Sequence, residues 1–403
     1  MKMIQKSDYL VKSITLLNLQ IILDFTCSYF GVGGQMQSLE RYFAYTIVTF
    51  FFLKGIRRNY QRPSFDIILF LGWITIILLR SLPDVLNPYF NYVNFKQFIS
   101  GKLFVFIIPF VILVNLKIQT IREIFKLSYR LLFVYWFFVV ILFREIFIAH
   151  EFIGQSITIF SSGIGLLLLT YSYQDTKHNR VIWGTLFIVI TSMMLIGRRS
   201  VAVYYLSLLC SSLYLNLSVQ TSKKSNVFSL FLIVSLTVFF FVMFFTSTFD
   251  FFWERMATGM ESRDGIIELF IEDFDSSPKD WIYGRGLYGT FFGGVLGNDE
   301  LDGARTLIEN GYLNLILNGG YIYVVLLVMV CLRSVYLGLF DSKNILCKGM
   351  AFIILIYFID MIGYGLPSQN LKYLCIFLSI AGTRTKELRQ MTNNELVNYL
   401  SLK

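Results

Sequence analysis

The sequence predicts an all-α, polytopic membrane protein with about 12 transmembrane helices and one large external loop that contains a short amphipathic helix. Two features of the composition support this fold class. Of the 403 residues, 56% are hydrophobic and only 15% are charged, whereas soluble chains carry about 25% charged residues. The apolar residues also gather in runs of roughly 16 to 25, the length that crosses a hydrocarbon core of about 30 Å as a helix. A water-soluble enzyme is thereby excluded.

The apolar runs together predict one transmembrane domain, 1–403. The first run follows a basic flank and has no small-residue cleavage site after it, so we expect a retained span and not a signal peptide. A large external loop, 250–309, separates the ninth run from the tenth. Hydropathy places the runs at 10–28, 41–54, 65–82, 98–116, 128–148, 156–174, 181–197, 200–218, 227–249, 311–335, 348–366 and 369–383.

Basic residues predict the orientation of these spans. The chain carries 35 Lys and Arg against 26 Asp and Glu, a net charge of +9. With a cytoplasmic N-terminus, every cytoplasmic connection is basic and most acidic residues lie outside, as the positive-inside rule requires. We therefore expect a multi-pass membrane protein with both termini in the cytoplasm. The net charge then indicates contact with anionic lipid of the bilayer and not with nucleic acid.

The sequence gives no sign of a metal centre, a cofactor or a disulfide framework. The five Cys are scattered without a Cys-x-x-Cys pair, and the two His, His150 and His178, lie far apart. Zinc, copper and haem sites require such ligands close together. We expect none of these groups.

The loop 250–309 combines an amphipathic segment with a glycine-rich one. Residues 254–273 predict a short helix on which Arg263 lies on the same side as Ile267 and Phe270. Six glycines follow between residues 284 and 297, with Tyr288 among them. Glycines at this density permit tight turns or a close approach of backbone to ligand. They are also common in plain mobile loops, and that alternative stays open.

Arginines on the external side carry the strongest functional signal, because charge near a bilayer is costly. Arg198 and Arg199 lie between two apolar runs with almost no loop between them. They are candidates for binding a phosphate or pyrophosphate, since a guanidinium offers bidentate contacts. Alternatively, their stems lie in hydrocarbon and their heads reach water. Further candidates for the same anion lie in the loop: Arg255, Arg263 and Arg285, with Arg263 and Arg285 preferred because many loop carboxylates offer ordinary ion pairs.

The start of the tenth span provides the candidate acid–base and sugar-binding groups. Glu309 is a candidate general base that could accept a proton from an attacking sugar hydroxyl; the alternative is a helix-start acid favoured by the helix dipole. Gly319 and Gly320 are expected to permit close helix packing. Two acids inside spans, Asp24 and Asp360, are expected to pair with neighbouring helices, or to serve a proton pathway. Candidate ligands for sugar hydroxyls are Asn310, Tyr312, Asn314 and Tyr288.

Three local patterns give this chain its family resemblance. The first is GRRS at 197–200, and the second is the series of Arg255, SRDGIIELF with Arg263, and YGRGLYG at 283–289. The third is ENGYLNLILNGG at 309–320. In this order around a long external loop, they resemble the O-antigen polymerase and ligase superfamily, the Wzy-type membrane glycosyltransferases of the GT-C class. The resemblance covers roughly the last half of the chain. It favours Arg199 over Arg198 as the arginine that binds the anion.

The resemblance implies an enzyme that polymerises undecaprenyl-diphosphate-linked oligosaccharide repeat units of O-antigen, capsule or exopolysaccharide at the outer membrane face. It implies a lipid-linked donor and acceptor and no nucleotide sugar, metal or other cofactor. A flippase and a chain-length regulator are possible partners. Family ligases carry histidine where this chain has Glu309, which favours polymerase over ligase.

Two alternative functions remain open. One is a ligase that transfers finished glycan to another acceptor. The other is a lipid-linked oligosaccharide flippase or secondary transporter, for which the sequence shows neither two-halves symmetry nor a pair of broken helices.

Overall fold

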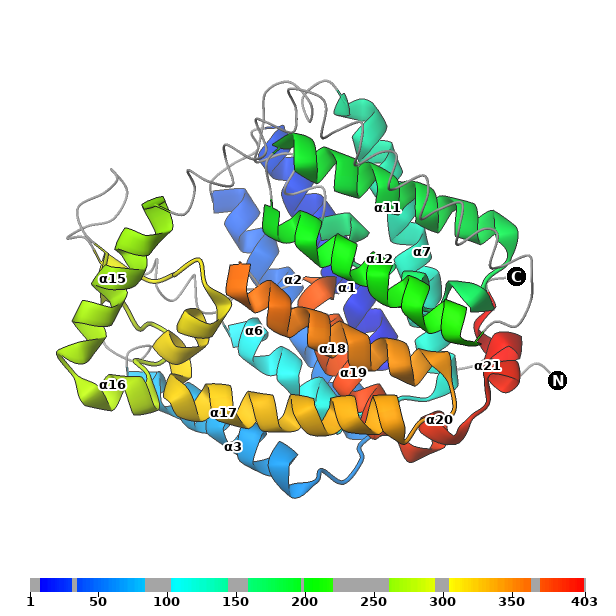
Figure 1. Ribbon diagram of the computed structural model, residues 1–403. Coiled ribbons are helices and arrows are strands. Elements are labelled where there is room, and N and C mark those ends of the chain that lie inside the picture. The colour runs from blue at the N-terminus through cyan, green and yellow to red at the C-terminus, as the bar shows by residue number, and fades with distance from the viewer. Residues whose placement is uncertain are drawn as a thin grey trace.

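The computed structural model describes residues 8–30, 35–83, 103–143, 159–196, 199–219, 261–293, 304–363 and 370–401. Helices make up most of these ranges, which confirms the all-α class (Figure 1). The β structure described is a ribbon of two antiparallel strands, in which Phe291 pairs with Arg305, and an isolated bridge between Tyr60 and Val114. The ninth predicted span, 227–249, lies outside the described residues.

The N-terminal half of the chain forms the larger part of one helix bundle. Apolar contacts between α1 and α2 and between α11 and α12 make antiparallel pairs, and the short α10 is buried along its whole length. The elements are α1 (Tyr9–Tyr29), α2 (Gln35–Arg58), α3 (Phe65–Arg80), α6 (Leu103–Ile107), η2 (Ile108–Leu113), α7 (Ile118–Ile141), α10 (Ile164–Leu169), η3 (Tyr171–Tyr173), α11 (Thr176–Ile196) and α12 (Arg199–Val219).

The C-terminal half adds three long helices to this bundle and a small module at one end of it. Helix α17 contacts α3, α18 and α19, and α18 also contacts α12. The elements are α15 (Glu261–Asp275), α16 (Pro278–Tyr283), β1 (Phe291–Phe292), β2 (Ala304–Arg305), α17 (Gly311–Phe340), α18 (Ile345–Gly363), α19 (Leu371–Arg384), α20 (Lys386–Gln390) and α21 (Asn393–Leu400).

Four helices in the described ranges are long and apolar enough to cross a membrane: Tyr9–Tyr29, Ile118–Ile141, Gly311–Phe340 and Ile345–Ile362. Other predicted spans correspond to shorter apolar helices. The predicted span 98–116 contains only the 11 residues Leu103–Leu113, which change from α-helix to 3-10 helix. Pro109 lies in the first turn of the 3-10 segment, and its missing N–H cannot support an α-helix continuing through it.

The surface of α17 indicates a membrane environment. Six large apolar side chains follow one face of the helix at intervals of three or four residues, and all are between 46% and 75% exposed. A stripe of this length would be avoided on a protein surface in water. From first to last it covers about 30 Å at 1.5 Å per residue, the thickness of a hydrocarbon core. The stripe consists of Tyr321, Val325, Met329, Leu332, Tyr336 and Phe340.

The connections between helices lie at two ends of the bundle. At the distal end, as we call it, Asp8 accepts hydrogen bonds from Thr120 at 2.5 Å and from Asn59 at 3.4 Å. At the same end Tyr173 donates to Asn393 at 2.7 Å. These residues lie in or beside segments with the basic composition predicted for cytoplasmic connections. In Figure 1 α20 and α21 lie at this end and α15 and α16 at the opposite end, the module end.

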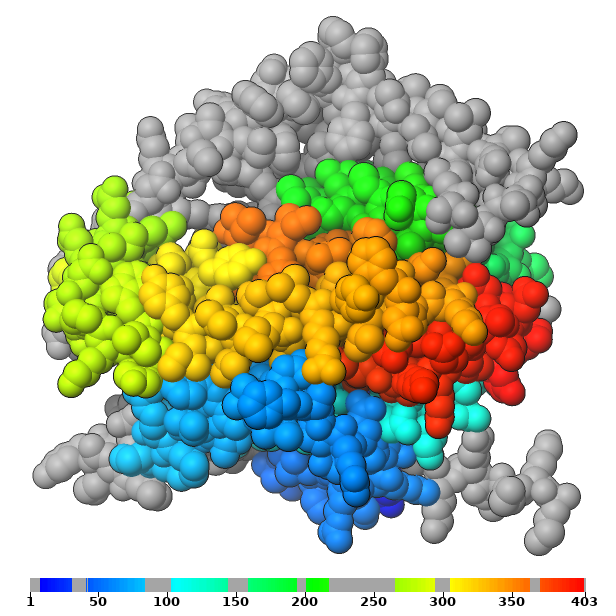
Figure 2. All heavy atoms as spheres, turned by 60° about the horizontal axis from the view of Figure 1, so that its bottom comes forward, coloured from blue at the N-terminus to red at the C-terminus, as the bar shows by residue number. Residues whose placement is uncertain are grey.

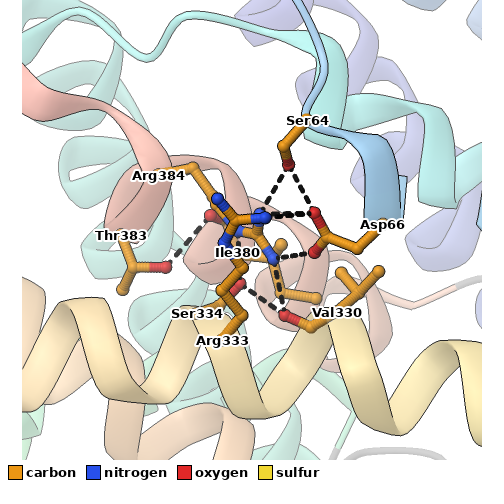
Figure 3. A network of polar contacts seen from close by, with 8 residues as sticks. All are labelled: Ser64, Asp66, Val330, Arg333, Ser334, Ile380, Thr383 and Arg384. Carbon is orange, nitrogen blue, oxygen red and sulfur yellow. Dashed lines mark hydrogen bonds and ion pairs between the residues drawn. The ribbon is translucent and has the colours of Figure 1, made fainter. Parts of the chain in front are cut away.

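A charged network at the distal end joins α3, α17 and α19 (Figure 3). The Arg384 guanidinium contacts Asp66 at 2.5 and 3.2 Å, and it donates to Ser64 at 2.7 Å and to Ser334 at 2.9 Å. Arg333 contacts the same Asp66 carboxylate at 2.9 Å. Asp66 and Arg384 have side chains only 9% and 7% exposed, so their charges are compensated by each other and by hydrogen bonds. The network fixes the distal ends of three helices.

Candidate functional site

Helix α17 is broken at Gly320, which has φ +68° and ψ −175°. The break divides the helix into a short segment, 311–319, and a long segment, 321–340. It also leaves carbonyl groups without helical partners. The backbone N–H of Arg285 donates to the carbonyl of Leu317 at 2.7 Å, and the indole N–H of Trp73 donates to the carbonyl of Gly319 at 2.9 Å. The sequence predicts only close helix packing at Gly319 and Gly320, whereas the structure shows a break in the helix at Gly320.

The segment that fills the break comes from the large loop. We define the loop module as residues 261–293 and 304–310, which contain α15, α16 and the β ribbon. At Gly320 an added Cβ would lie 2.0 Å from the carbonyl oxygen of Ile282, and at Gly284 it would lie 2.5 Å from the nitrogen of Gly319. Gly284 also has a positive φ of +66°. Both positions therefore require glycine for contact between the two backbones.

The end of α3 fastens the loop module from the other side. The Arg80 guanidinium donates to the carbonyls of Tyr283 at 2.9 Å and Gly284 at 3.1 Å. The Ser81 hydroxyl accepts from the backbone N–H of Leu287 at 3.1 Å. Figure 2 shows the module against both α17 and α3, with the C-terminal helices at the far end. The loop is thus docked on the bundle through backbone groups.

Arg285 organises the interior of the module. Its guanidinium contacts Asp280 at 2.7 Å, pairs with Asp273 and donates to the carbonyl of Thr290 at 2.7 Å. It also lies 4.5 Å from the ring centroid of Phe274. Burial lowers the pKa of Arg285, but the hydrogen bonds to Asp280 and Asp273 outweigh burial and raise it. Because two carboxylates already occupy this guanidinium, the geometry favours a structural role over the predicted role in pyrophosphate binding.

Glu309 lies outside helix α17, which begins at Gly311. The residue is exposed, and its two predicted roles, general base and helix-start acid, both stay predictions. The helix N-cap is Asn310, whose side chain accepts from the N–H of Leu313 at 3.1 Å. Asn310 also donates to the carbonyl of Ile362 at 3.4 Å. The side-chain oxygen of this predicted sugar ligand therefore caps α17, and its side-chain nitrogen ties α17 to α18.

Of the other predicted sugar ligands, Asn314 lines a cavity. Tyr312 donates to the carbonyl of Phe358 at 3.0 Å and so also ties α17 to α18. Tyr288 packs half-buried against the main core. Asn314 is 5% exposed and borders a cavity of about 90 Å³ between α17, α6 and the residues that follow β2. The cavity is lined by Val105, Phe106, Thr306, Leu307, Asn314, Leu315, Asn318 and Tyr323.

Asn318 extends this polar face and was missed by the sequence analysis. Asn310, Asn314 and Asn318 follow one another at intervals of four residues, so they share one face of the short segment of α17. Asn318 donates to the carbonyl of Asn314 at 2.7 Å and to its side-chain oxygen at 3.2 Å. The repeated spacing was the sequence signal that could have identified it.

The predicted anion-binding arginines are described only in part. Arg199 is the first residue of α12, and Arg263 lies in the first turn of α15. Figure 1 shows both helices beginning toward the module end of the molecule. Arg198 and Arg255 lie outside the described residues. The structure therefore shows where Arg199 and Arg263 lie along their helices. Their role as anion ligands stays a prediction.

A buried ion pair links helices near the start of α12. Lys372 lies 2.6 Å from the Asp360 carboxylate, whose side chain is 2% exposed, and 4.0 Å from the ring centroid of Tyr204. The pair confirms that Asp360 contacts a neighbouring helix. Asp24 likewise pairs with Arg41 at 2.6 Å. The sequence analysis did not single out Lys372, since nothing in its local sequence shows which carboxylate it faces.

Within the described ranges, no three His, Cys, Asp or Glu side chains gather as metal ligands would. Besides the Asp273 and Asp280 carboxylates that pair with Arg285, the polar groups at the module end include amides, arginines and backbone N–H groups, which suit hydroxyls and anions. No protein-family model, curated protein or solved structure matches this chain.

Proposed function

We propose that this protein is a metal-independent glycosyltransferase that polymerises undecaprenyl-diphosphate-linked oligosaccharide repeat units of O-antigen, capsule or exopolysaccharide. The observation that carries the proposal is the grouping at one end of the bundle. Helices α12 and α15, which begin at or near Arg199 and Arg263, both start toward the module end in Figure 1, where the loop module and a cavity bordered by two asparagines also lie. This combination suits a substrate with an anionic diphosphate and polar sugars.

The proposed topology has about 12 spans in the bacterial cytoplasmic membrane, with the loop module outside. Both termini are cytoplasmic in this arrangement. This topology is supported by the division of the described helix ends between the distal end and the module end. The predicted basic character of the distal connections also supports it. A flippase would deliver the substrate to the module end, and a chain-length regulator would be a further partner.

In the proposed reaction, arginines bind the donor diphosphate and stabilise the negative charge that develops on the leaving group. Arg199 stands at a helix N-terminus, where backbone N–H groups and the helix dipole also favour an anion. Arg263, Arg198 and Arg255 remain proposed ligands of the same diphosphate. Arg285 is reassigned to holding the loop module because Asp273 and Asp280 pair with it.

The acceptor hydroxyl attacks the anomeric carbon of the donor, the bond to the diphosphate oxygen breaks, and the hydroxyl proton leaves to a base or to water. Glu309 is the proposed base, and its exposed position gives it access to a substrate outside the bundle. Replacing Glu309 with Gln removes the proton acceptor at nearly unchanged size. Full activity of this variant would show that proton removal needs no group at Glu309.

The function is tested by the length of glycan made in cells. Arg199→Ala and Arg263→Ala should leave the protein level unchanged and abolish long chains, so that single repeats accumulate on the carrier lipid. Arg57→Ala is the matched control, because Arg57 is an exposed residue at the distal end of α2. Chain-length ladders like those of the unchanged protein in both test variants would exclude these arginines from the mechanism.

The two alternatives differ in product. A ligase-deficient cell accumulates finished polymer on the carrier lipid, and a polymerase-deficient cell accumulates single repeats. The broken helix α17 is a feature that transporters also use, since unwound backbone can coordinate a transported ion. Here the carbonyls of Leu317, Asn318 and Gly319 already accept protein N–H groups, which favours a structural joint. Uptake of lipid-linked substrate into vesicles without any change in glycan length would instead support a transporter.

A further inference from the structure

We propose that the cavity beside α17 binds the acetamido group of an N-acetylated sugar in the substrate. This inference rests on the proposed function and names a class of sugar for the same site. It is drawn from the polar groups, walls and volume of the cavity.

The two asparagines of the cavity leave one donor and one acceptor for a ligand, and Thr306 and Tyr323, which also line the cavity, carry hydroxyl groups. Asn318 uses its side-chain nitrogen to donate to Asn314, whose side-chain oxygen accepts at 3.2 Å. The remaining groups are therefore the side-chain nitrogen of Asn314 and the side-chain oxygen of Asn318, both on residues that line the cavity. Within the described part of the chain, no hydrogen bond is made by that nitrogen of Asn314, although the residue is 5% exposed. An amide nitrogen without a protein partner on the wall of a cavity favours a ligand that can accept its hydrogen bond.

A secondary amide matches this pair. Its carbonyl oxygen accepts from Asn314, and its N–H donates to Asn318. Both asparagines lie one turn apart on the short segment of α17, which holds their side chains on one face of the helix. The contact between them also fixes the direction of each amide.

The other walls suit a methyl group. Val105, Phe106, Leu315 and Tyr323 contribute apolar surface. The Phe106 and Tyr323 rings stack with their centroids 6.2 Å apart, which makes a rigid wall on one side. An acetamido group combines an amide with one methyl. A hydroxyl alone could satisfy the asparagines, but it would leave the apolar part of the cavity unfilled.

The volume of the cavity limits the ligand to a small group. A cavity of about 150 Å³ holds benzene, with six heavy atoms, so a volume of about 90 Å³ holds about four. An acetamido group has four heavy atoms: one nitrogen, one oxygen and two carbons. A whole sugar ring is far larger, so the ring would remain outside the cavity with only this substituent inserted.

The experiment measures binding by saturation-transfer NMR with the full chain in lipid nanodiscs. The probe is the methyl glycoside of N-acetylglucosamine, and the methyl glycoside of glucose is the comparison. The expected result is saturation concentrated on the acetyl methyl, with at least a threefold weaker signal for the glucose probe. Equal saturation of both probes would overturn the inference.

Two variants test whether the acetyl group binds in the cavity beside α17. Asn314→Leu removes the free donor at similar side-chain size, and Val105→Phe fills the cavity from α6 while both asparagines remain. Each should reduce the acetyl signal at least threefold, whereas Asn398→Leu on exposed α21 at the distal end should not. If Asn314→Leu fails to fold, Val105→Phe decides alone, and an unchanged acetyl signal in that variant overturns the inference.

This assay separates the inference from the proposed function because it requires no polymerisation. If the protein binds the acetyl group selectively but makes no polymer, the proposed polymerase function is wrong and the acetamido site stands. If the protein polymerises glycan but binds both probes equally, the proposed function stands and the proposed acetamido site is wrong.

Discussion

Gly284 in the loop module and Gly320 in α17 hold two backbones so close that neither residue tolerates a Cβ. The added atom would lie 2.5 Å from the Gly319 nitrogen in one case and 2.0 Å from the Ile282 oxygen in the other. The two glycines are 36 positions apart in the sequence and belong to different parts of the fold. Through this contact the loop module and the broken helix α17 form one surface. The candidate site lies at that surface.

Gly320→Ala and Gly284→Ala should each undock the loop module. The positive φ alone costs about 1–3 kcal/mol for a residue with a side chain, and the overlap with backbone adds to this. Thermal unfolding in detergent and limited proteolysis between residues 261 and 293 measure the effect. The control is Gly265→Ala, because no atom lies within 4 Å of an added Cβ there. Unchanged protease resistance in both test variants would contradict the docking role.

Arg285→Lys should loosen the module although it preserves the charge. A lysine cannot contact Asp273, Asp280 and the Thr290 carbonyl together, so about 1–3 kcal/mol of charged hydrogen bonding is lost. Proteolysis of the module should become faster, while Lys279→Ala on the exposed surface of α16 should have no effect. If both variants behave alike, Arg285 is not the residue that organises the module.

Asp66→Ala should destabilise the bundle by about 3–5 kcal/mol, because the buried Arg384 would lose its counter-charge. Arg333→Ala leaves the contact between Asp66 and Arg384 in place, and the Arg333 side chain is 55% exposed. We expect its cost to stay below about 1 kcal/mol. Unfolding temperatures of the two variants, measured in the same detergent, test the difference. If the two variants lower the unfolding temperature equally, the contact between Asp66 and Arg384 contributes no more than a surface ion pair.

The pair of Asp360 and Lys372 should behave non-additively in a double-mutant cycle. Each single variant, Asp360→Asn or Lys372→Met, leaves one buried charge without its partner. The double variant removes both charges and should be more stable than either single variant. Additive losses in thermal unfolding would indicate that the two charges are screened from each other.

Protonation of Glu395 should loosen α21 at low pH. Hydrogen bonds from the Thr392 backbone and hydroxyl lower the pKa of Glu395 from its usual 4.5. The carboxylate therefore contributes helix stability fully above about pH 4.5, and this contribution is lost as the pH falls through the lowered value. Amide hydrogen exchange of residues 393–400 should accelerate over that range. Glu395→Gln should remove the pH dependence.

Hydropathy predicted the region of each long apolar helix because burial and lipid exposure depend on local composition, but it placed the start of α7 at residue 128 and the helix begins at Ile118. The predicted tenth span begins at residue 311, where α17 begins. The predicted spans 181–197 and 200–218 meet where α11 ends at Ile196 and α12 begins at Arg199. The amphipathic helix of the loop was also correctly expected, and the described part of it is Glu261–Asp275. Run length alone could not show that 98–116 contains a helix of mixed type, since Pro109 acts through one missing N–H.

The candidate site was harder to predict because it depends on contacts between distant segments. Gly320 adopts its conformation against Gly284, and Arg80 becomes a ligand of the loop only once α3 and the module meet. The local sequence of Glu309 gave a charge but not its exposure. The asparagines at intervals of four residues were visible in the sequence, yet only the cavity distinguishes Asn314 from the helix cap Asn310.

The exposed apolar stripe of α17 begins at Tyr321, directly after the break. If hydrocarbon covers the stripe, the short segment of α17 and its asparagines stand at the depth of the lipid phosphates. A carrier whose tail remains in the leaflet would then hold its diphosphate and first sugars at the level of the cavity. Such a substrate reaches the protein by lateral diffusion, so its concentration within the bilayer, and not in the surrounding water, sets how often the site is occupied.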